Sequence, residues 1–323
     1  MKGIKKLIPT KNIKVWYQKK DFGVAWAITD GENITITFGD IDTNTKCYHT
    51  SKVLSGSQLK KLQLDNLSIK GTNLISGRIK LQLVAATDRP SLPSIENCEK
   101  ISSEQLPPSI LDFKEFVSKD NRHPNFNGVC FTKEGLTVAT DRIKMLFRKH
   151  SAHLEKDYMI TTAALEALSH LPKPTLHLVD SCSKVTSGSI TVYSNNVNYS
   201  YTNYNLMIPS NPPHIFSGKI NLKDVDLIVD SIAGAIVFHG VSAYTRNGSV
   251  EVLEKNTWLA DYPVGLNLGH LKKCIKVSGN NINVSCLGEG RPVVINNEIL
   301  LMPVNQKFTE PIWEMLKKKY LEM

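Results

Sequence analysis

Few residues of this chain stand at the spacings that catalysis or metal binding requires. The densest polar cluster contains His153, Glu155 and Asp157, and no paired carboxylates recur elsewhere to hold a metal. The chain has no P-loop, no G-x-G-x-x-G, no nucleophile elbow and no H-E-x-x-H motif. Its nine histidines are scattered, without acids or cysteine pairs at ligand spacing. We therefore expect no catalytic residue, no metal and no cofactor, and argue against an enzyme.

Lysines are the residues whose placement suggests binding chemistry instead. The formal net charge is +9, and the first twenty residues contain seven lysines and no acidic residue. Such asymmetry suggests a polyanionic partner, of which nucleic acid is the commonest, while simple solubility is the alternative. The charge alone leaves both interpretations open.

Composition and cysteine usage are those of an ordinary globular protein. The 323 residues are 41% hydrophobic and 21% charged, which suits two or three domains and excludes a disordered, collagenous or coiled-coil chain. The longest apolar stretch, residues 225–241, contains Asp226, Asp230 and His239, and no apolar signal-peptide core follows the first lysines. The six cysteines are scattered, which fits buried thiols in a reducing compartment. We expect a cytoplasmic protein without a membrane partner.

Three segments share one layout that is typical of β-hairpins. Each has an aromatic residue, a Gly-Val pair, an alternating run, a turn that ends in glycine and a second alternating run. The segments are Phe22–Ile36, Phe126–Val138 and Phe238–Val252. Chance similarity between amphipathic hairpins is the simpler alternative, but short helices recur in the same order, at residues 57–62, 164–168 and 268–275.

This repeat predicts an α+β protein made of three β-rich units. Two further helices are expected before the second and third hairpins, at residues 109–118 and 222–233, the latter capped by Asn221. Proline clusters at 89–93, 107–108 and 209–213 mark the junctions. We expect domain 1 at 1–105, domain 2 at 106–213, domain 3 at 214–304 and an amphipathic tail at 305–323.

Several strings in the second and third units carry a resemblance to a known family. They are the strand F-N-G-V-C-F followed by L-T-V-A-T-D-R at residues 136–142, and residues 205–212, 266–271, 291–295 and 300–304. These strings resemble the central-domain motif, the domain junction, the asparagine-led helix and the closing strands with their M-P-x ending of the bacterial DNA sliding clamp, the beta subunit of DNA polymerase III. The resemblance is specific in these two units and weak in the first.

The resemblance implies three tandem clamp units with sheets outside and short helices lining an inner face. Two chains would close a homodimeric ring of six units around double-stranded DNA, which would tether a polymerase without chemistry. The basic residues on the expected inner helices are Lys60, Lys61, Lys114, Lys119, Arg122, Lys223, Lys272, Lys273 and Lys276. For each of them a plain solvated helix face is the alternative.

The resemblance also implies an apolar cleft that accepts short peptides from the replicative polymerase and the clamp loader. The matching positions are Thr140, Ile143, Met145, Pro209, Pro212, Leu300, Leu301, Met302, Pro303 and Val304. Aliphatic anchors would supply most of the affinity in such a site. Ordinary core is the alternative for these residues.

Residues 311–321 are predicted to form a short amphipathic helix. Pro311 suits its first position, and Ile312, Trp313, Leu316 and Tyr320 share a face. The simplest expectation is that this helix packs on the third unit. The alternative is that it folds over the peptide cleft or contacts a polymerase.

Several departures from the family pattern leave alternatives open. We expect no first helix in domain 1, because the strand-like residues 13–17 begin almost at once, and the A-T-D string loses its glycine and histidine. A divergent clamp, such as one encoded by a phage, fits these changes, in which case the host cytoplasm is the expected location. A processivity factor that binds DNA without closing a ring, and a structural β-repeat protein, are the alternatives.

Overall fold

The computed structural model of the chain describes residues 15–19, 24–29, 35–39, 47–50, 67–70, 72–86, 95–120, 122–188, 190–197, 201, 204–229, 234–254, 257–260, 262 and 264–320. The chain forms two compact units: residues 1–138 with 148–201, and residues 139–147 with 202–323. The expected helix at residues 57–62, with Lys60 and Lys61, lies outside the described residues, as does the segment before Val15. The three predicted domain bounds stay predictions.

The first unit contains an eleven-stranded antiparallel sheet. Its strands, in order across the sheet, are β5 (Leu67–Lys70), β6 (Asn73–Ser76), β7 (Ile79–Ala86), β4 (Cys47–Thr50), β3 (Thr35–Gly39), β2 (Val24–Thr29), β1 (Val15–Lys19), β15 (Ile190–Asn195), β14 (Cys182–Ser187), β13 (Thr175–Leu178) and β8 (Glu99–Ile101). Strand β1 joins predicted domains 1 and 2, because it pairs with β15 from Val15 opposite Ser194 to Lys19 opposite Ile190.

A second group of elements completes the first unit. It comprises the 3₁₀ helices η4 (Ile110–Glu115) and η5 (Pro124–Phe126), strands β9 (Gly128–Phe131), β10 (Leu136–Thr140) and β12 (Tyr158–Thr161), and helix α2 (Thr162–His170). The apolar spacing predicts helix α2, and Thr161 caps it, since its hydroxyl accepts a hydrogen bond from the Ala164 amide. Its side chains Leu165 and Leu168 are buried, and η4 lies beside it.

The second unit contains two antiparallel sheets. One has the order β11 (Lys144–Lys149), β24 (Ile299–Leu301), β23 (Val293–Ile295), β22 (Asn281–Cys286), β16 (His214–Ile220) and β20 (Leu253–Glu254). The other has the order β19 (Gly248–Glu251), β18 (Ser242–Thr245), β17 (Ala235–His239) and β21 (Gly265–Asn267). The Trp258 ring stacks on Phe238 at 4.6 Å and on Phe216 at 5.9 Å, which ties the two sheets into one core.

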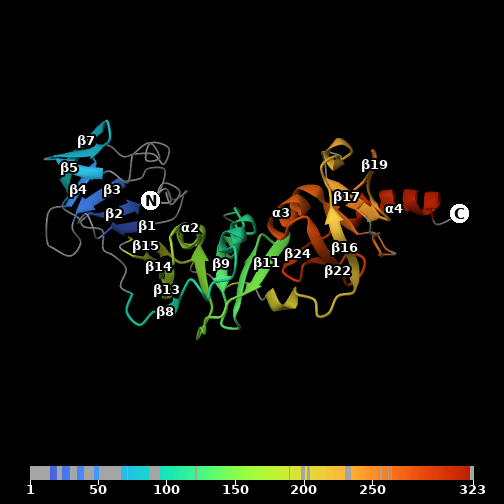
Figure 1. The fold of residues 1–323 in the computed structure, drawn as a ribbon, viewed down its shortest axis with the longest axis horizontal. Helices are drawn as coiled ribbons and strands as arrows, with labels where there is room; N and C mark the ends of the chain where they lie inside the picture. Colours follow the sequence, from blue (N-terminus) through green and yellow to red (C-terminus); the bar gives the residue numbers. More distant parts are fainter. Residues whose placement is uncertain are drawn as a thin grey trace. The chain divides into compact units, whose positions relative to one another are not determined.

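Helix α3 (Leu268–Ser278) follows β21 directly and lies against β22 and β24 (Figure 1). The Asn267 side chain caps it by accepting a hydrogen bond from the His270 amide at 3.0 Å. The shorter 3₁₀ helices of this unit are η6 (Tyr204–Leu206) and η7 (Val225–Leu227). The prediction of a helix at residues 268–275 is confirmed.

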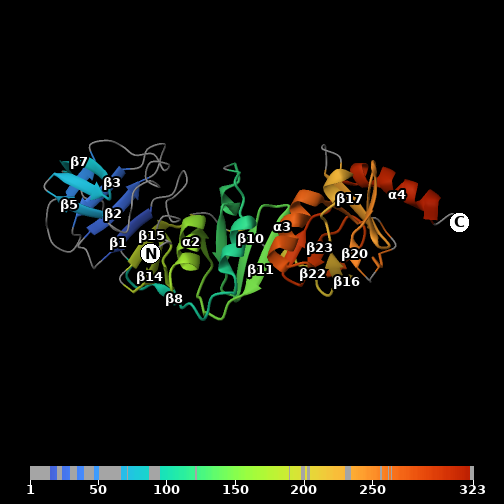
Figure 2. The ribbon, with the colours of Figure 1, turned by 45° about the horizontal axis from the view of Figure 1, so that its top comes forward.

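Helix α4 (Gln306–Tyr320) packs on β17, and the two lie side by side in both views (Figure 2). Ile312, Trp313 and Leu316 are buried against Val237 and Tyr244, so the prediction that the tail packs on domain 3 is confirmed. The predicted start at Pro311 is wrong, since α4 begins five residues earlier with Pro311 inside it. Gly265 permits the close approach, because a Cβ there would overlap the side chain of Thr309.

Two predicted α-helices are replaced by 3₁₀ turns. The segment 109–118 forms only η4, because Ser109 adopts a left-handed φ of 50° directly after a proline pair. Among residues 222–229, only η7 is helical, and Asn221 accepts a hydrogen bond from the Lys223 amide instead of capping an α-helix. The β-branched residues Val225, Ile228 and Val229 lower the helix propensity of this segment.

The order of strands and helix recurs in predicted domains 2 and 3, but the Gly-Val match between them is offset by one strand. Helices α2 and α3 follow β12 and β21, which pair with β9 and β17 respectively, so β17 is the counterpart of β9. The match of Gly128-Val129 with Gly240-Val241 in the sequence instead makes β18 the counterpart of β9. The two glycines serve different purposes: Gly128 permits β12 to approach, with the Ile160 carbonyl 2.6 Å from a hypothetical Cβ, whereas Gly240 adopts φ 57° in a turn.

Candidate functional site

A basic concavity of about 580 Å³ lies beside α3 in the second unit. Its lining combines four lysines with two asparagines, one aspartate and an apolar floor: Lys219, Lys223, Lys272, Lys276, Asn221, Asn280, Asp226, Ile220, Leu222 and Ile275. Lys272 and Lys276 are four residues apart, so one face of α3 directs both into the concavity. Lys219 points outward from β16 because its neighbour Ile220 is buried.

One acidic residue restrains this group of lysines. The Lys272 ammonium forms an ion pair with the Asp226 carboxylate, which connects α3 to η7. The side chains are 37% and 62% exposed, so water screens the pair and it contributes little to stability. With four ammonium groups and one carboxylate, the concavity keeps an excess of positive charge.

The other predicted basic residues lie in different settings. Lys114 on η4 forms an ion pair with Glu166 on α2, and Arg122 binds Asp120 through two nitrogens at 2.9 Å, one to each carboxylate oxygen. The Arg122 guanidinium, together with its backbone amide, lowers the pKa of Asp120 to about 2. Lys119 is exposed.

Lys273 on α3 is exposed but does not line the concavity. Successive helix residues are separated by about 100°, so Lys273 does not share the direction of Lys272. Burial is the main cause of the lowered pKa of His270, and the charge of Lys273 contributes a smaller lowering. The concavity therefore contains three of the predicted basic residues, Lys223, Lys272 and Lys276. It also contains Lys219 and the two asparagines, which were not predicted from the sequence.

Lysines in such a concavity suit a polyanion rather than a reaction. Flexible ammonium groups bind phosphates as point charges without reading bases, and the asparagine amides add neutral donors. Among the described residues, no group of three His, Cys, Asp or Glu side chains could hold a metal. In the same part of the chain, no helix is long and apolar enough to cross a membrane.

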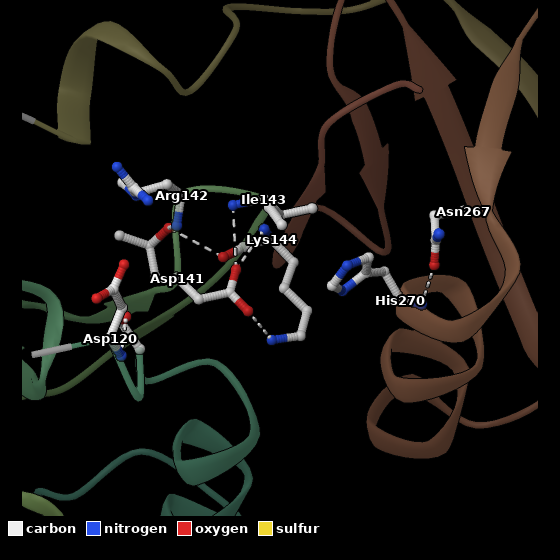
Figure 3. Close-up of polar contacts among 9 residues, drawn as sticks. Asp120, Asp141, Arg142, Ile143, Lys144, Asn267 and His270 are labelled. Carbon is white, nitrogen blue, oxygen red and sulfur yellow. Dashed lines mark hydrogen bonds and ion pairs between the residues drawn. The ribbon is translucent and has the colours of Figure 1, made fainter. Parts of the chain in front are cut away.

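A second candidate site lies at the turn between residues 140 and 145, where several hydrogen bonds converge (Figure 3). Asp141 Oδ1 accepts hydrogen bonds from the amides of Ile143 and Lys144, at 3.1 and 2.9 Å. Its other oxygen accepts one from the Lys144 ammonium at 2.5 Å. The Thr140 hydroxyl donates to the Lys144 carbonyl at 2.9 Å and accepts from the Arg142 amide at 3.0 Å.

This turn presents apolar side chains beside the neighbouring strand. Strand β11 pairs with β24, and the Met302 amide donates to the Ile143 carbonyl at 2.8 Å. Ile143 and Met302 are therefore cross-strand neighbours, and they are 43% and 40% exposed. We call this pair the apolar patch.

The remaining predicted cleft residues divide by burial. Pro209, Pro212, Pro303 and Val304 are half-buried, so part of each faces solvent. Met145, Leu300, Leu301 and Thr140 are no more than 3% exposed, and they form the packed layer beneath the turn. Contact between a partner and this second group would require a change of conformation.

His270 and Cys274 on α3 lie close enough to the Asp141–Lys144 pair for its charges to influence their pKa values. Burial is the largest cause of the lowered pKa of His270, with smaller opposing effects from Asp141 and Lys144. Burial also raises the pKa of the Cys274 thiol to about 12, so this thiol stays protonated and inert. We therefore interpret His270 and Cys274 as residues that support the turn and not as reactive groups.

Comparison with solved structures decides the fold. No family model and no curated protein matches the chain. The DNA polymerase III beta subunit of Thermotoga maritima is similar at a TM-score of 0.66 and 16% identity, over 90% of this chain and 91% of that one. The chain has the sliding-clamp fold.

Other solved clamps support the same conclusion. The Borrelia burgdorferi beta subunit, in complex with a natural product, is similar at a TM-score of 0.66 and 14% identity, over 94% of this chain and 96% of that one. The Helicobacter pylori beta clamp, bound to a DNA ligase peptide, is similar at 0.65 and 15% identity, over 90% and 91%. The predicted fold class is therefore confirmed, while the assignments of individual DNA-contact and cleft residues stay predictions.

Proposed function

We propose that the chain is a DNA polymerase processivity factor that encircles duplex DNA and tethers replication proteins. The observation that carries this proposal is the basic concavity beside α3, which occurs within a sliding-clamp fold that extends over at least 90% of the chain. A structural β-repeat protein has no need of four lysines around one concavity. The arrangement suits phosphate contacts that ignore base sequence.

The lysines would hold the duplex loosely. Each ammonium group on its flexible stem follows a phosphate and releases a counterion when it binds, and water remains between the partners. Lys272 reaches a phosphate only by leaving Asp226, and this exchange is nearly neutral because the pair is exposed. Contacts of this kind retain DNA without fixing its position, which permits sliding.

Ring closure would use the sheet edges. Strand β19 pairs only with β18 among the described strands, so its other edge is open to a second copy of the chain. Head-to-tail pairing of two chains with three units each would close a six-unit ring. Light scattering then gives a mass near twice 36.0 kDa, and a monomer at every concentration contradicts the closed ring.

The apolar patch would receive peptides from the polymerase and the clamp loader. Ile143 and Met302 supply exposed anchoring surface, the half-buried residues Pro303 and Val304 follow Met302 directly, and the Asp141–Lys144 pair holds the turn. The similar Helicobacter pylori clamp is bound to a DNA ligase peptide, which supports a peptide site in this fold.

Retention on circular and linearised plasmid DNA tests the proposed function. A closed ring stays on the circular plasmid through a sizing column and slides off the linear form. Equal retention on both forms contradicts encirclement and favours a processivity factor that binds DNA without closing. No retention at low salt, even with a clamp loader and ATP, contradicts DNA binding altogether.

A further inference from the structure

Cys98 differs in its surroundings from the other cysteines that the structure describes. Its side chain is half-buried, whereas the others are buried: Cys130, Cys182, Cys274 and Cys286. Cys98 directly precedes β8, which ends the eleven-stranded sheet and pairs only with β13 among the described strands. Because a half-buried thiol at a sheet edge is accessible to small molecules, its reactivity depends on its neighbours.

A histidine contacts this thiol. The Cys98 Sγ lies 3.5 Å from Nδ1 of His177 on β13, and Nε2 of the same ring lies 3.0 Å from the Thr186 hydroxyl on β14. When Nε2–H donates to Thr186, the lone pair of Nδ1 faces the thiol and can accept its proton. Burial, with smaller effects from Lys184 and Lys100, lowers the pKa of His177, so the ring is neutral at pH 7 and keeps this lone pair.

Two lysines flank the histidine on the same face of the sheet. His177 is directly opposite Lys100 on β8 and Lys184 on β14. Among the described residues no carboxylate forms an ion pair with either lysine, although the Lys184 ammonium also lies 5.7 Å from the centroid of the Tyr193 ring. Glu99 precedes Lys100 in the strand and therefore points to the opposite face. The charges that affect the pKa of His177 are thus both positive.

We propose that Cys98 is a modification site, at which the thiol exchanges with small disulfides that carry negative charge, such as glutathione disulfide. The Cys98 thiol gives its proton to His177, and the resulting thiolate attacks one sulfur of the disulfide. A bond forms between Cys98 Sγ and that sulfur, the disulfide bond breaks, and the departing thiolate takes the proton from the imidazolium. The protein thiol is oxidised and one half of the disulfide is reduced, so the reaction needs no further oxidant.

The two lysines give the site its preference for anions. Reactive cysteines lie in partly exposed positions near basic groups, and ammonium groups bind carboxylates as point charges. Lys100 is exposed and Lys184 is half-buried, so both are accessible to the carboxylates of a disulfide that reacts at Cys98. The site belongs to the first unit and does not depend on the proposed binding of DNA or of peptides.

Exchange kinetics with two reagents test the proposal on the full chain. Dithiobisnitrobenzoate carries carboxylates, whereas dithiodipyridine is neutral, and each releases a coloured product when a thiol attacks it. Dithiobisnitrobenzoate should react with Cys98 faster than with N-acetylcysteine at pH 7, and peptide mapping by mass spectrometry should locate the adduct at Cys98. Cys98→Ser should lose this fast phase while the buried thiols stay unlabelled.

Lysine variants separate charge selection from the reactivity of the thiol. Lys100→Gln with Lys184→Gln should slow the reaction with dithiobisnitrobenzoate about three- to tenfold at low salt, relative to the reaction with dithiodipyridine. Lys133→Gln with Lys149→Gln removes two exposed lysines of the same unit and is the matched control, which should keep the ratio of the wild type. His177→Gln should slow both reagents alike, because the imidazole acts on the thiol and not on the reagent.

Glutathione disulfide itself completes the test. It should add a glutathionyl group at Cys98 of the wild type, and an excess of reduced glutathione should remove that group. A Cys98 thiol that reacts no faster than N-acetylcysteine, or an adduct found at another cysteine in its place, overturns the proposed site. An unchanged ratio of the two reagents in the Lys100 and Lys184 double variant, or an equal fall in the control, overturns the selection of anionic disulfides.

Discussion

Removal of two concavity lysines should reduce the salt dependence of DNA binding by a calculable amount. Lys223 and Lys276 line the concavity beside α3, and both are exposed. Each phosphate contact with duplex DNA contributes about 0.9 to the slope of log K against log salt. The double variant Lys223→Ala with Lys276→Ala should therefore lower the slope by about 1.8.

This difference is large enough to measure. Between about 50 and 200 mM salt, the wild type should lose about twelvefold more affinity than the double variant, since the fourfold salt change is raised to the power of about 1.8. Fluorescence anisotropy with a short labelled duplex gives both slopes. Asp226→Asn should act in the opposite direction and steepen the slope, because it releases Lys272.

Lys273→Ala is the matched control on the same helix. It removes one exposed ammonium group, but its side chain does not line the concavity. Its slope should equal that of the wild type. If Lys273→Ala lowers the slope as much as Lys276→Ala does, net charge and not the concavity determines binding, and an unchanged slope in the double variant refutes the phosphate contacts.

Three further predictions concern stability. Trp313→Ala should lower the free energy of unfolding by about 3–5 kcal/mol, because the ring lies on the buried face of α4 and is only 5% exposed. Met315→Ala, at a side chain 43% exposed on the same helix, should change the free energy of unfolding by less than about 0.5 kcal/mol. Lys144→Met should cost about 2 kcal/mol in urea unfolding, because it leaves Asp141 19% exposed without its ammonium partner, and an unchanged midpoint would contradict the importance of that pair. Burial lowers the pKa of His150 below its value in the unfolded chain, so the unfolded chain takes up the proton first as the pH falls. The free energy of unfolding should therefore be unaffected by His150 above about pH 6.5 and should decrease below it. His150→Gln should flatten the decline of the thermal midpoint between about pH 7 and 5.

The local periodicity of apolar residues was sufficient to predict some elements and not others. Helices α2 and α3 have leucines three or four residues apart and a capping threonine or asparagine, so local pattern and tertiary structure agree. The segments before the second and third hairpins have similar spacing, but Ser109 is left-handed and Val225, Ile228 and Val229 are β-branched. Only 3₁₀ turns form there.

The composition of the candidate site depends on contacts that sequence spacing does not contain. Lys272, Lys273 and Lys276 follow one another closely, yet only the first and last line the concavity. Lys219 joins them from β16, and nothing in its local pattern distinguishes it from any outward lysine on a strand. The buried positions of Leu300 and Leu301 likewise follow from the pairing of β24 with two strands.

The two units place an ion pair between the same two kinds of element, with the charges exchanged. In the first unit the lysine is on the 3₁₀ helix, as Lys114, and the acid on the α-helix, as Glu166; in the second unit Lys272 is on α3 and Asp226 on η7. A count of lysines therefore overstates the positive charge that a polyanion meets, because each acid occupies one ammonium group. Since both pairs are partly exposed, a phosphate group could replace the carboxylate at little cost in either unit. Under the proposed function, such exchange would suit a protein that holds a duplex at many positions in succession, because no single contact would be strong enough to stop its movement.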